Sequence, residues 1–317
     1  MKTESHKAPN NRTLTLTDDE RAVLRKSVQY PQSSPTVLDT DAAGTLLCAD
    51  LLEAIDRIPD HCADLIIIDP PYNLSKDFGE VKFNARSAQS YDAYLRTWFP
   101  RVCQKLSPRG TLYMCGDWRC TSALQRVMEE AGLTLQNRIT WQREKGRGSQ
   151  KNWKNSMEDV WMGVRNPKDY TFNVEAVMQR RRVVAPYRDA DGQPKDWDET
   201  SDGRFRTTYP SNFWDDISVP FWSMPENTDH PTQKPEKLMA KLILASSNPG
   251  DLVFDPFMGS GTTCVVAKKL GRRYLGIDVN EEYCLWAAKR LAQAEQDNSI
   301  QGYSDGVFWE RNPRQKF

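Results

Sequence analysis

An apolar segment that ends in Asp69-Pro70-Pro71-Tyr72 constrains the fold of this chain more than any other feature. Residues 62–73 read CADLIIIDPPYN, so an extended strand here is apolar on both faces. Such a strand is typical of a parallel sheet that helices cover on both sides. The two prolines end the strand, because each fixes φ at about −65° and lacks an N–H donor. We therefore expect an α/β fold built around this strand.

Helical and extended patterns alternate on both sides of an irregular middle region. The first series is a helix in 46–60, the strand in 62–73, a helix in 91–105 that is interrupted near its proline, a strand in 110–117, a helix in 121–131 and a strand in 134–144. The second series is a helix in 234–247, a strand in 251–257, a helix in 262–271, a strand in 272–280 and a helix in 282–295. This alternation predicts an open, doubly wound, mostly parallel α/β sheet with an irregular insert.

The charge balance restricts how the chain binds a partner. Its 317 residues include 43 basic and 43 acidic side chains, so the formal net charge is +0. Binding to nucleic acid therefore requires basic residues gathered on one face.

The seven cysteines include no C-x-x-C pair and there are three histidines, so we expect no metal site. The polar start and the lack of a long apolar run predict no membrane segment and a cytoplasmic location.

The Asp69-Pro70-Pro71-Tyr72 motif follows a strand at the edge where open α/β sheets place their chemistry. A stiff turn can present the Asp69 carboxylate and the Pro70 carbonyl as two acceptors. The exocyclic amine of a base is a poor nucleophile, and two acceptors for its hydrogens stabilise the positive charge that develops during attack. Tyr72 offers a flat face on which an extruded base stacks. The alternative is a Pro-Pro turn without chemistry.

A glycine-containing turn from Met258 to Thr263 joins a second strand to a helix, where a backbone can approach a nucleotide-like ligand. A phosphate loop would need a lysine directly after Gly261, where Thr262 stands, and a dinucleotide fingerprint would need a third glycine. The following strand ends at Asp278, close to the offset of about 20 residues at which an acid binds ribose hydroxyls. This region is predicted to bind a nucleoside without a pyrophosphate.

Three motifs follow one another in a fixed order: DPPY at 69–72, HPTQKP at 230–235 and DPFMGSG at 255–261. This order resembles the β group of DNA amino-methyltransferases, over most of 45–175 and 228–293. The resemblance implies a Rossmann-like S-adenosylmethionine-dependent methyltransferase fold, no metal, and catalysis by Asp69, Pro70, Pro71 and Tyr72. We divide the chain into a polar N-terminal arm outside the main fold at 1–35, a catalytic half at 36–142, a target-recognition insert at 143–227, a cofactor-binding half at 228–296 and a C-terminal tail at 297–317.

The resemblance also assigns residues to S-adenosylmethionine. Those expected to surround it are Asp69, Asp255, Phe257, Gly259, Ser260, Gly261 and Thr262, with Asp278 on the ribose. Lys234, with Thr232 nearby, is expected to meet the cofactor carboxylate, and Asp50 is expected to meet its adenine ring. Plainer interpretations are a surface lysine at a helix start for Lys234 and a helix N-terminal acid for Asp50.

A basic segment, QREKGRGSQKNWKN at 142–155, supplies the positive face that DNA binding requires. Trp141 is expected to close the base pocket opposite Tyr72, and a packed core tryptophan is the alternative. A second basic run at 179–182 is followed by aspartates that would repel phosphate, so it gives no recognition code. The residues expected to bind DNA are Tyr72, Trp141, Arg143, Lys145, Arg147 and Lys151.

These inferences predict an enzyme that methylates N6 of adenine at specific sites of double-stranded DNA, in a restriction-modification or epigenetic role. The N4 amine of cytosine is an alternative, although in this family the N4 enzymes more often carry serine in place of Asp69. Methylation of an RNA base and a nucleic-acid-binding protein with a relic motif are two further alternatives. A homodimer follows from the family alone, and the residues do not reveal the recognition sequence or a cognate restriction endonuclease.

Overall fold

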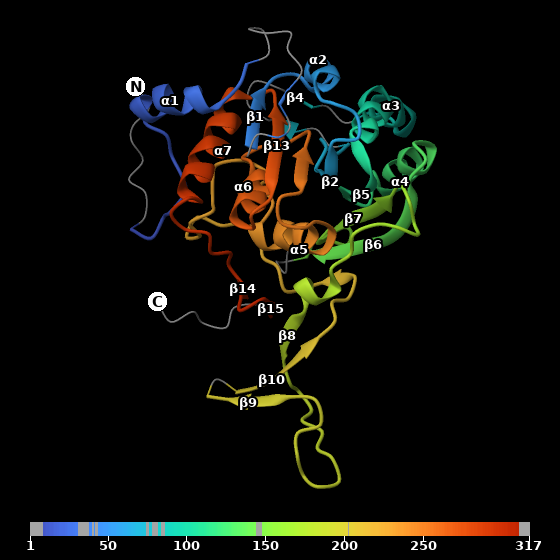
Figure 1. Ribbon diagram of the computed structural model, residues 1–317, viewed down its shortest axis with the longest axis vertical. Helices are drawn as coiled ribbons and strands as arrows, with labels where there is room; N and C mark the ends of the chain where they lie inside the picture. The colour runs from blue at the N-terminus through green and yellow to red at the C-terminus, as the bar shows by residue number, and fades with distance from the viewer. Residues whose placement is uncertain are drawn as a thin grey trace.

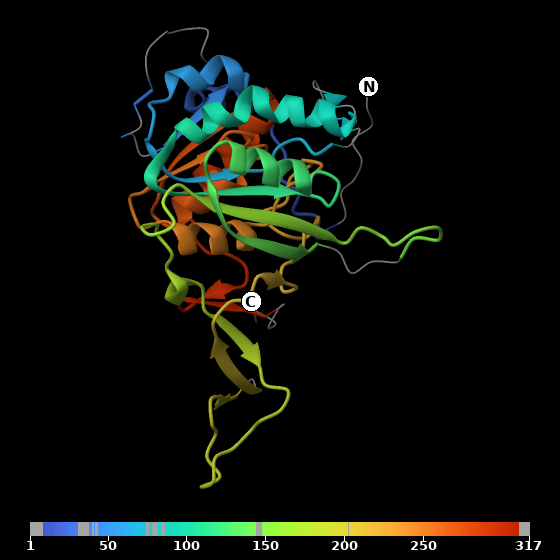
Figure 2. The same ribbon diagram turned by 90° about the vertical axis from the view of Figure 1, so that its right-hand side faces the viewer.

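The computed structural model describes residues 9–30, 38–39, 41, 44–73, 76–77, 82–83, 86–143, 148–201 and 203–310. A sheet with helices on both faces forms the body, and a thin arm of strands projects from one end of it (Figure 1). A second projection, the connection around residue 150, leaves the side of the body (Figure 2).

The main sheet has eight strands among the described residues, in the order β1-β13-β12-β2-β5-β7-β6-β11. Their bounds are β1 Gly44–Cys48, β2 Ala63–Ile68, β5 Leu106–Gly116, β6 Thr134–Gln142, β7 Met157–Val164, β11 Phe213–Trp214, β12 Leu252–Asp255 and β13 Arg273–Asp278. Neighbours from β1 to β5 are parallel, as are β11 and β6, whereas β7 is antiparallel to β5 and β6. The predicted doubly wound, mostly parallel sheet is confirmed. Because β7 belongs to it, the sheet extends past residue 142, where we expected the insert to begin.

Strand β2 is covered on both faces, as its sequence predicts. Ile66 and Ile68 belong to one apolar cluster, and Leu65 and Ile67 belong to another. All four side chains are fully buried. Successive side chains of a strand point to opposite faces, so a strand that is apolar at every position requires helices on both sides of its sheet.

The covering helices come from both halves of the chain. Their bounds are α2 Leu51–Ala54, α3 Ala88–Gln104, α4 Thr121–Glu130, α5 Glu236–Ser246, α6 Thr262–Lys269 and α7 Glu281–Gln293, with 3-10 turns η1 Arg25–Ser27, η3 Ile55–Arg57 and η4 Val174–Val177. Residues of α2, α3 and α4 pack with Ile66, residues of α5 pack with Leu65, and α6 and α7 pack around Leu46 of β1. Pro100 lies inside α3 without ending it, so the expected interruption is absent. Across the described residues, we find no helix with the length and apolar character that crossing a membrane requires.

The described N-terminal residues pack onto the body, which differs from the expected arm outside the main fold. Helix α1, Asp18–Leu24, lies beside α7 (Figure 1). Arg25 pairs with Glu281 at 3.0 Å, and Gln29 forms a parallel bridge with Leu47 of β1. The apolar side chain of Leu14 is buried in a cluster with aromatic residues of α7. Leucines in an otherwise polar segment thus anchor it to the fold.

The insert and the tail build a second sheet together. Its order is β14-β15-β8-β10-β9, and its bounds are β8 Gln179–Arg182, β9 Asp198–Thr200, β10 Gly203–Thr208, β14 Tyr303–Ser304 and β15 Val307–Trp309. A short separate hairpin pairs β3, Lys76–Asp77, with β4, Lys82–Phe83. Phe308 is fully buried in the core beside α5, and β15 pairs with β8, so residues 297–310 of the tail are fixed to the body and to the projecting strands. Strands β8, β9 and β10 form the thin projection that extends away from the main sheet (Figure 1).

Candidate functional site

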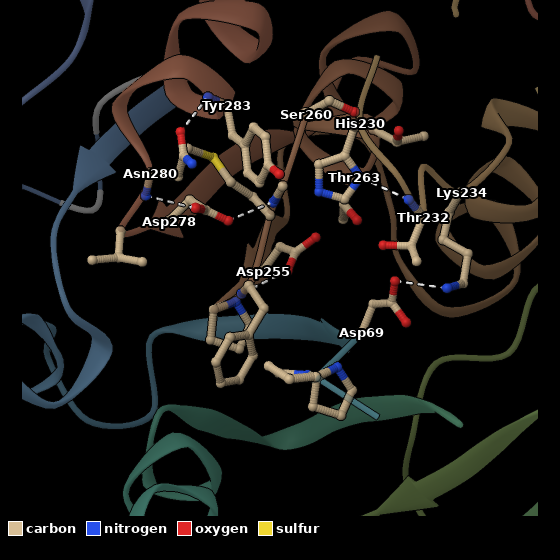
Figure 3. Close-up of a pocket in the computed structure, with 18 of the residues that line it drawn as sticks. Asp69, His230, Thr232, Lys234, Asp255, Ser260, Thr263, Asp278, Asn280 and Tyr283 are labelled. Atoms are coloured by element: carbon tan, nitrogen blue, oxygen red, sulfur yellow. Dashed lines mark hydrogen bonds and ion pairs between the residues drawn. The ribbon is translucent and has the colours of Figure 1, made fainter. Parts of the chain in front are cut away.

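A pocket of about 400 Å³ opens beyond the carboxyl ends of β1, β2, β12 and β13. Asp255 and Asp278 are the last residues of β12 and β13, Asp50 and Asp69 follow β1 and β2, and residues 230–234 close the pocket before α5 begins. Figure 3 shows labelled side chains from these segments facing a common space. Strand ends in an open α/β sheet are where ligands bind, because the loops there diverge and leave a crevice.

Most of the predicted site residues line this pocket. They are Asp50, Asp69, Pro70, Pro71, Tyr72, Arg143, Thr232, Lys234, Asp255, Phe257, Gly259, Ser260, Thr262 and Asp278. Gly261 is not among the lining residues; it caps α6 between Ser260 and Thr262, which are. Two residues predicted to bind DNA, Lys145 and Arg147, lie outside the described residues. Segments more than 150 residues apart in the sequence therefore meet at one edge of the sheet.

The Asp69 carboxylate is asymmetric. Its Oδ2 atom accepts a hydrogen bond from Lys234 Nζ at 2.7 Å, as Figure 3 shows. Its Oδ1 atom is buried and has no hydrogen-bond partner among the described residues. One oxygen is thus held in place, and the other retains its capacity to accept.

Lys234 lines the pocket and contacts the Asp69-Pro70-Pro71-Tyr72 motif, while its contact with a cofactor carboxylate stays a prediction. Its ammonium lies 2.7 Å from Asp69 Oδ2, 3.2 Å from the Tyr72 hydroxyl and 3.3 Å from Glu158 Oε2. Burial lowers the pKa of Lys234, but the Asp69 and Glu158 carboxylates outweigh burial and raise the pKa above its ordinary value. Burial, then the charges of Asp69 and Glu158, also raise the pKa of Tyr72. The lysine therefore stays charged and the tyrosine stays neutral.

The turn before α6 depends on two glycines with left-handed backbone. Gly259 has φ 52° and Gly261 has φ 76°. A Cβ atom added to Gly259 would lie 2.8 Å from His230 Nε2, and one added to Gly261 would lie 2.4 Å from Ala287 Cβ. Asp278 holds the turn, because its Oδ2 accepts from the backbone N–H of Gly259 at 2.9 Å. Burial raises the pKa of Asp278 to about 6.

Asp50 combines the two interpretations that the sequence left open. Its side chain caps α2 by accepting from the backbone N–H of Leu52 at 2.8 Å. It also lines the pocket, at the end of β1. A helix cap and a position beside a ligand are compatible, because a carboxylate has lone pairs for both.

Trp141 does not close the pocket, so that prediction is wrong. Its side chain is 1% exposed and packs in the core with α5. Its indole N–H donates to the backbone carbonyl of Ile217 at 3.0 Å. Trp141 and Arg143 are two residues apart on an extended segment, so both side chains point to the same face. Arg143 follows the carboxyl end of β6 and therefore reaches the pocket. Trp141 lies within β6, two residues before Arg143, and its side chain is covered by the core.

The sequence analysis missed several pocket residues. They are Arg86, Tyr94, His230, Gln233, Thr263, Asn280 and Tyr283, together with Glu158, which contacts the pocket residues Tyr72, Lys234 and Arg143. Glu158 carried a usable signal, since it is an acid at a position of β7 that alternation makes inward-facing. The described residues hold no group of three or more metal-ligating side chains.

Burial makes Asp255 sensitive to pH. Its pKa is raised to about 7 by burial, although its Oδ1 accepts from the N–H of Phe257 at 3.0 Å. The neutral acid stabilises the fold below its ordinary pKa, and this contribution is lost as the pH rises toward 7. We expect the effect of Asp255→Asn on the free energy of unfolding to be more favourable at pH 8 than at pH 5 by roughly 2–3 kcal/mol, because about two pH units separate pH 5 from the pKa of about 7 and each is worth about 1.4 kcal/mol. Urea unfolding at both pH values measures this difference.

The matched control is Asp169→Asn, which removes an exposed carboxylate that pairs with Arg109 at 2.9 Å. Its effect on the free energy of unfolding should be nearly the same at pH 5 and pH 8. An equal effect of Asp255→Asn at the two pH values would contradict the raised pKa.

Comparisons with known proteins agree with this geometry. Residues 63–290 match the family model described as DNA methylase (N6_N4_Mtase). The Type II methyltransferase M.HpaI of Haemophilus parainfluenzae is 35% identical over 247 residues, which cover 78% of this chain and 73% of that protein. The DNA adenine methyltransferase YhdJ of Escherichia coli (strain K12) is 34% identical over 258 residues, covering 78% of this chain and 83% of that protein.

Solved structures extend the likeness to the fold. The crystal structure of the M1.HpyAVI-SAM complex is 26% identical, covers 77% of this chain and 96% of that chain, and superposes with a TM-score of 0.53. The fold is thus the Rossmann-like fold of methyltransferases, as predicted. The family model spans the chain from the start of β2 into α7, and relatives above 30% identity cover most of the chain. This protein therefore belongs to the N6/N4 DNA methylase family.

Proposed function

We propose that this DNA methylase transfers a methyl group from S-adenosylmethionine to N6 of adenine, in a base flipped out of duplex DNA. The Asp69 carboxylate carries the proposal: Oδ2 is held by Lys234, while Oδ1 is buried without a hydrogen-bond partner among the described residues. A buried acceptor that lacks a donor is unfavourable. An N–H group of the target amine would satisfy it.

S-adenosylmethionine fits the residues of the pocket. The volume of about 400 Å³ is suited to a nucleoside-sized ligand. Gly259 allows close approach of the backbone, and the Asp278 carboxylate beside it has lone pairs for ribose hydroxyls. Asp50 also lines the pocket, after the end of β1, which pairs with β13 and so brings it to the side of Asp278, and we propose that it meets the adenine ring. When bound, the cofactor supplies an electrophilic methyl group on a sulfonium.

The residues of the chain orient and activate the amine. Asp69 Oδ1 and the Pro70 carbonyl accept its hydrogens, which favours the nitrogen as positive charge develops on it. The Tyr91 hydroxyl donates to the Pro71 carbonyl at 3.1 Å and so fixes the turn. The Lys234 ammonium lies 5.2 Å from the centre of the Tyr72 ring, and this ring, which lines the pocket, is the surface on which we propose that the base stacks. The transfer is direct and needs no covalent intermediate on the enzyme.

Two observations favour adenine N6 over cytosine N4. The first residue of the catalytic motif is Asp69, where N4 enzymes more often have serine. YhdJ, at 34% identity, is named a DNA adenine methyltransferase.

The DNA is proposed to approach along the β6–β7 connection. Arg143 lies at its base, where its backbone N–H donates to the Ser156 carbonyl at 2.8 Å and its side chain lines the pocket. Lys151 lies exposed further along the same connection. Phosphate contacts of this kind weaken with salt. The segment from β8 to β10 is proposed to recognise the target sequence. A homodimer and a cognate restriction endonuclease stay predictions.

Product analysis tests the proposed function. The protein is incubated with S-adenosylmethionine labelled in its methyl group and with genomic duplex DNA, and the DNA is digested to nucleosides. We expect the label in N6-methyl-2′-deoxyadenosine. Label in N4-methylcytosine alone would overturn the choice of base, and label in RNA but not in DNA would overturn the choice of substrate. Sequencing of the modified positions then gives the recognition sequence.

A further inference from the structure

Glu158 lies at the centre of the charged groups behind the catalytic motif. It is 4% exposed and comes from β7, the strand between β5 and β6. Its Oε2 lies 3.3 Å from Lys234 Nζ and accepts from the Tyr72 hydroxyl at 3.2 Å. Its Oε1 accepts from Arg143 at 2.8 Å. One buried carboxylate thus contacts three residues that line the pocket.

These contacts form a row of alternating charges. Arg143 pairs with Glu158, Glu158 with Lys234, and Lys234 with Asp69. A lysine ammonium has three hydrogens, and three oxygens lie within 3.3 Å of this one. A buried ammonium loses its hydration, so anionic or polar partners must contact its hydrogens to offset this loss. Without the charge of Glu158, Lys234 would depend on Asp69 alone.

We propose that Glu158 is a positioning residue that holds Lys234 on a single oxygen of Asp69. This inference rests on the proposed function, in which Asp69 Oδ1 accepts from the target amine. When Glu158 draws Lys234 toward β7, the ammonium engages Oδ2 and leaves Oδ1 without a donor. When that pull is lost, the ammonium moves toward Asp69 and competes with the amine for Oδ1.

Tyr72 gives Glu158 a second means of positioning. The Tyr72 hydroxyl donates to Glu158 and accepts from Lys234, so the plane of the ring is set from both sides. This ring follows Asp69 by three residues and is the proposed stacking surface for the base. Glu158 therefore orients both the acceptor of the amine and the surface that holds its ring.

The test is Glu158→Gln, which keeps the shape of the side chain and removes its charge. We expect kcat to fall roughly 10- to 100-fold, the size of a lost hydrogen bond to a charged group. The Kd for S-adenosylmethionine should stay within about threefold of the wild-type value, the scatter expected for an untouched site. Because the charge of Glu158 helps to keep the pKa of Lys234 above its ordinary value, the wild-type kcat should show no alkaline loss over the pH range in which duplex DNA is intact, whereas Glu158→Gln should show one.

Two further variants make the result decisive. Glu158→Asp keeps the charge, so it should show no alkaline loss over that pH range, and its kcat should lie between those of the wild type and Glu158→Gln. Glu130→Gln neutralises a carboxylate that pairs with Arg96 at 2.8 Å on α3 and α4, and it should change neither kcat nor the profile. An unchanged kcat in Glu158→Gln, or a lowered kcat without an alkaline loss, would overturn the inference.

The inference and the proposed function fail in different ways. If the wild-type protein does not methylate adenine in DNA, the proposed function is wrong. If it does so, and Glu158→Gln behaves as the wild type, only the positioning role is wrong. If Glu158→Gln does not bind the cofactor, Glu158→Asp decides: an alkaline loss of kcat in this variant would overturn the inference, and a profile like that of the wild type supports it.

Discussion

Asp69→Asn is expected to lower the rate of methyl transfer by at least roughly 10²- to 10³-fold, the loss seen when one group that stabilises a developing charge is removed. Asparagine has nearly the same shape but no charge, and its amide can present N–H donors to the amine in place of an acceptor. Cofactor binding should be largely retained, because the glycine turn and Asp278 lie across the pocket from this carboxylate (Figure 3). Single-turnover methyl transfer and titration with S-adenosylmethionine measure the two effects separately.

The control for this prediction is Asp60→Asn. Asp60 also pairs with a lysine, Lys105, at 2.6 Å, but it lies at the opposite end of β2 and does not line the pocket. Its replacement should leave the rate of transfer unchanged. If Asp69→Asn transfers methyl groups at the wild-type rate, then Asp69 is not the acceptor of the amine.

The sequence predicts the main sheet well because its strands and helices each carry a local pattern. Apolar β2 requires cover on both faces, and the alternation around it leaves few topologies. The antiparallel strand β7 is harder to predict, because it follows a basic segment that interrupts the alternation of helical and extended patterns. The packing of α1 was not predicted, because it depends on ion pairs such as Arg25–Glu281 between residues more than 250 positions apart.

The site divides in the same way. Motif residues such as Asp69 and Gly259 are recognisable from spacing, and the structure brings them to one pocket. Trp141 was misassigned because burial depends on depth in the sheet, which the sequence of one strand does not report. The partners of Lys234 were not predictable either, because Glu158 belongs to a strand whose place in the sheet is set by tertiary pairing.

Gly261→Ala should have the largest effect on folding. Gly261 has φ 76°, and an added Cβ would lie 2.4 Å from Ala287 Cβ and 3.0 Å from Ala287 Cα. A backbone atom of α7 cannot rotate away, so α6 and α7 would have to separate and disturb the core between them. We expect the free energy of unfolding to fall by at least about 3 kcal/mol, from overpacking together with a left-handed alanine. Urea unfolding measures this loss.

Gly271→Ala separates the two contributions. Gly271 has φ 74°, close to that of Gly261, but nothing lies within 4 Å of an added Cβ. Only the backbone term applies there, so its loss should be roughly 1–2 kcal/mol. Equal losses in the two variants would mean that the contact of α6 with α7 adapts to a methyl group. A larger loss at Gly261, with weaker binding of S-adenosylmethionine than in Gly271→Ala, would show that the helix contact holds the cofactor turn in shape.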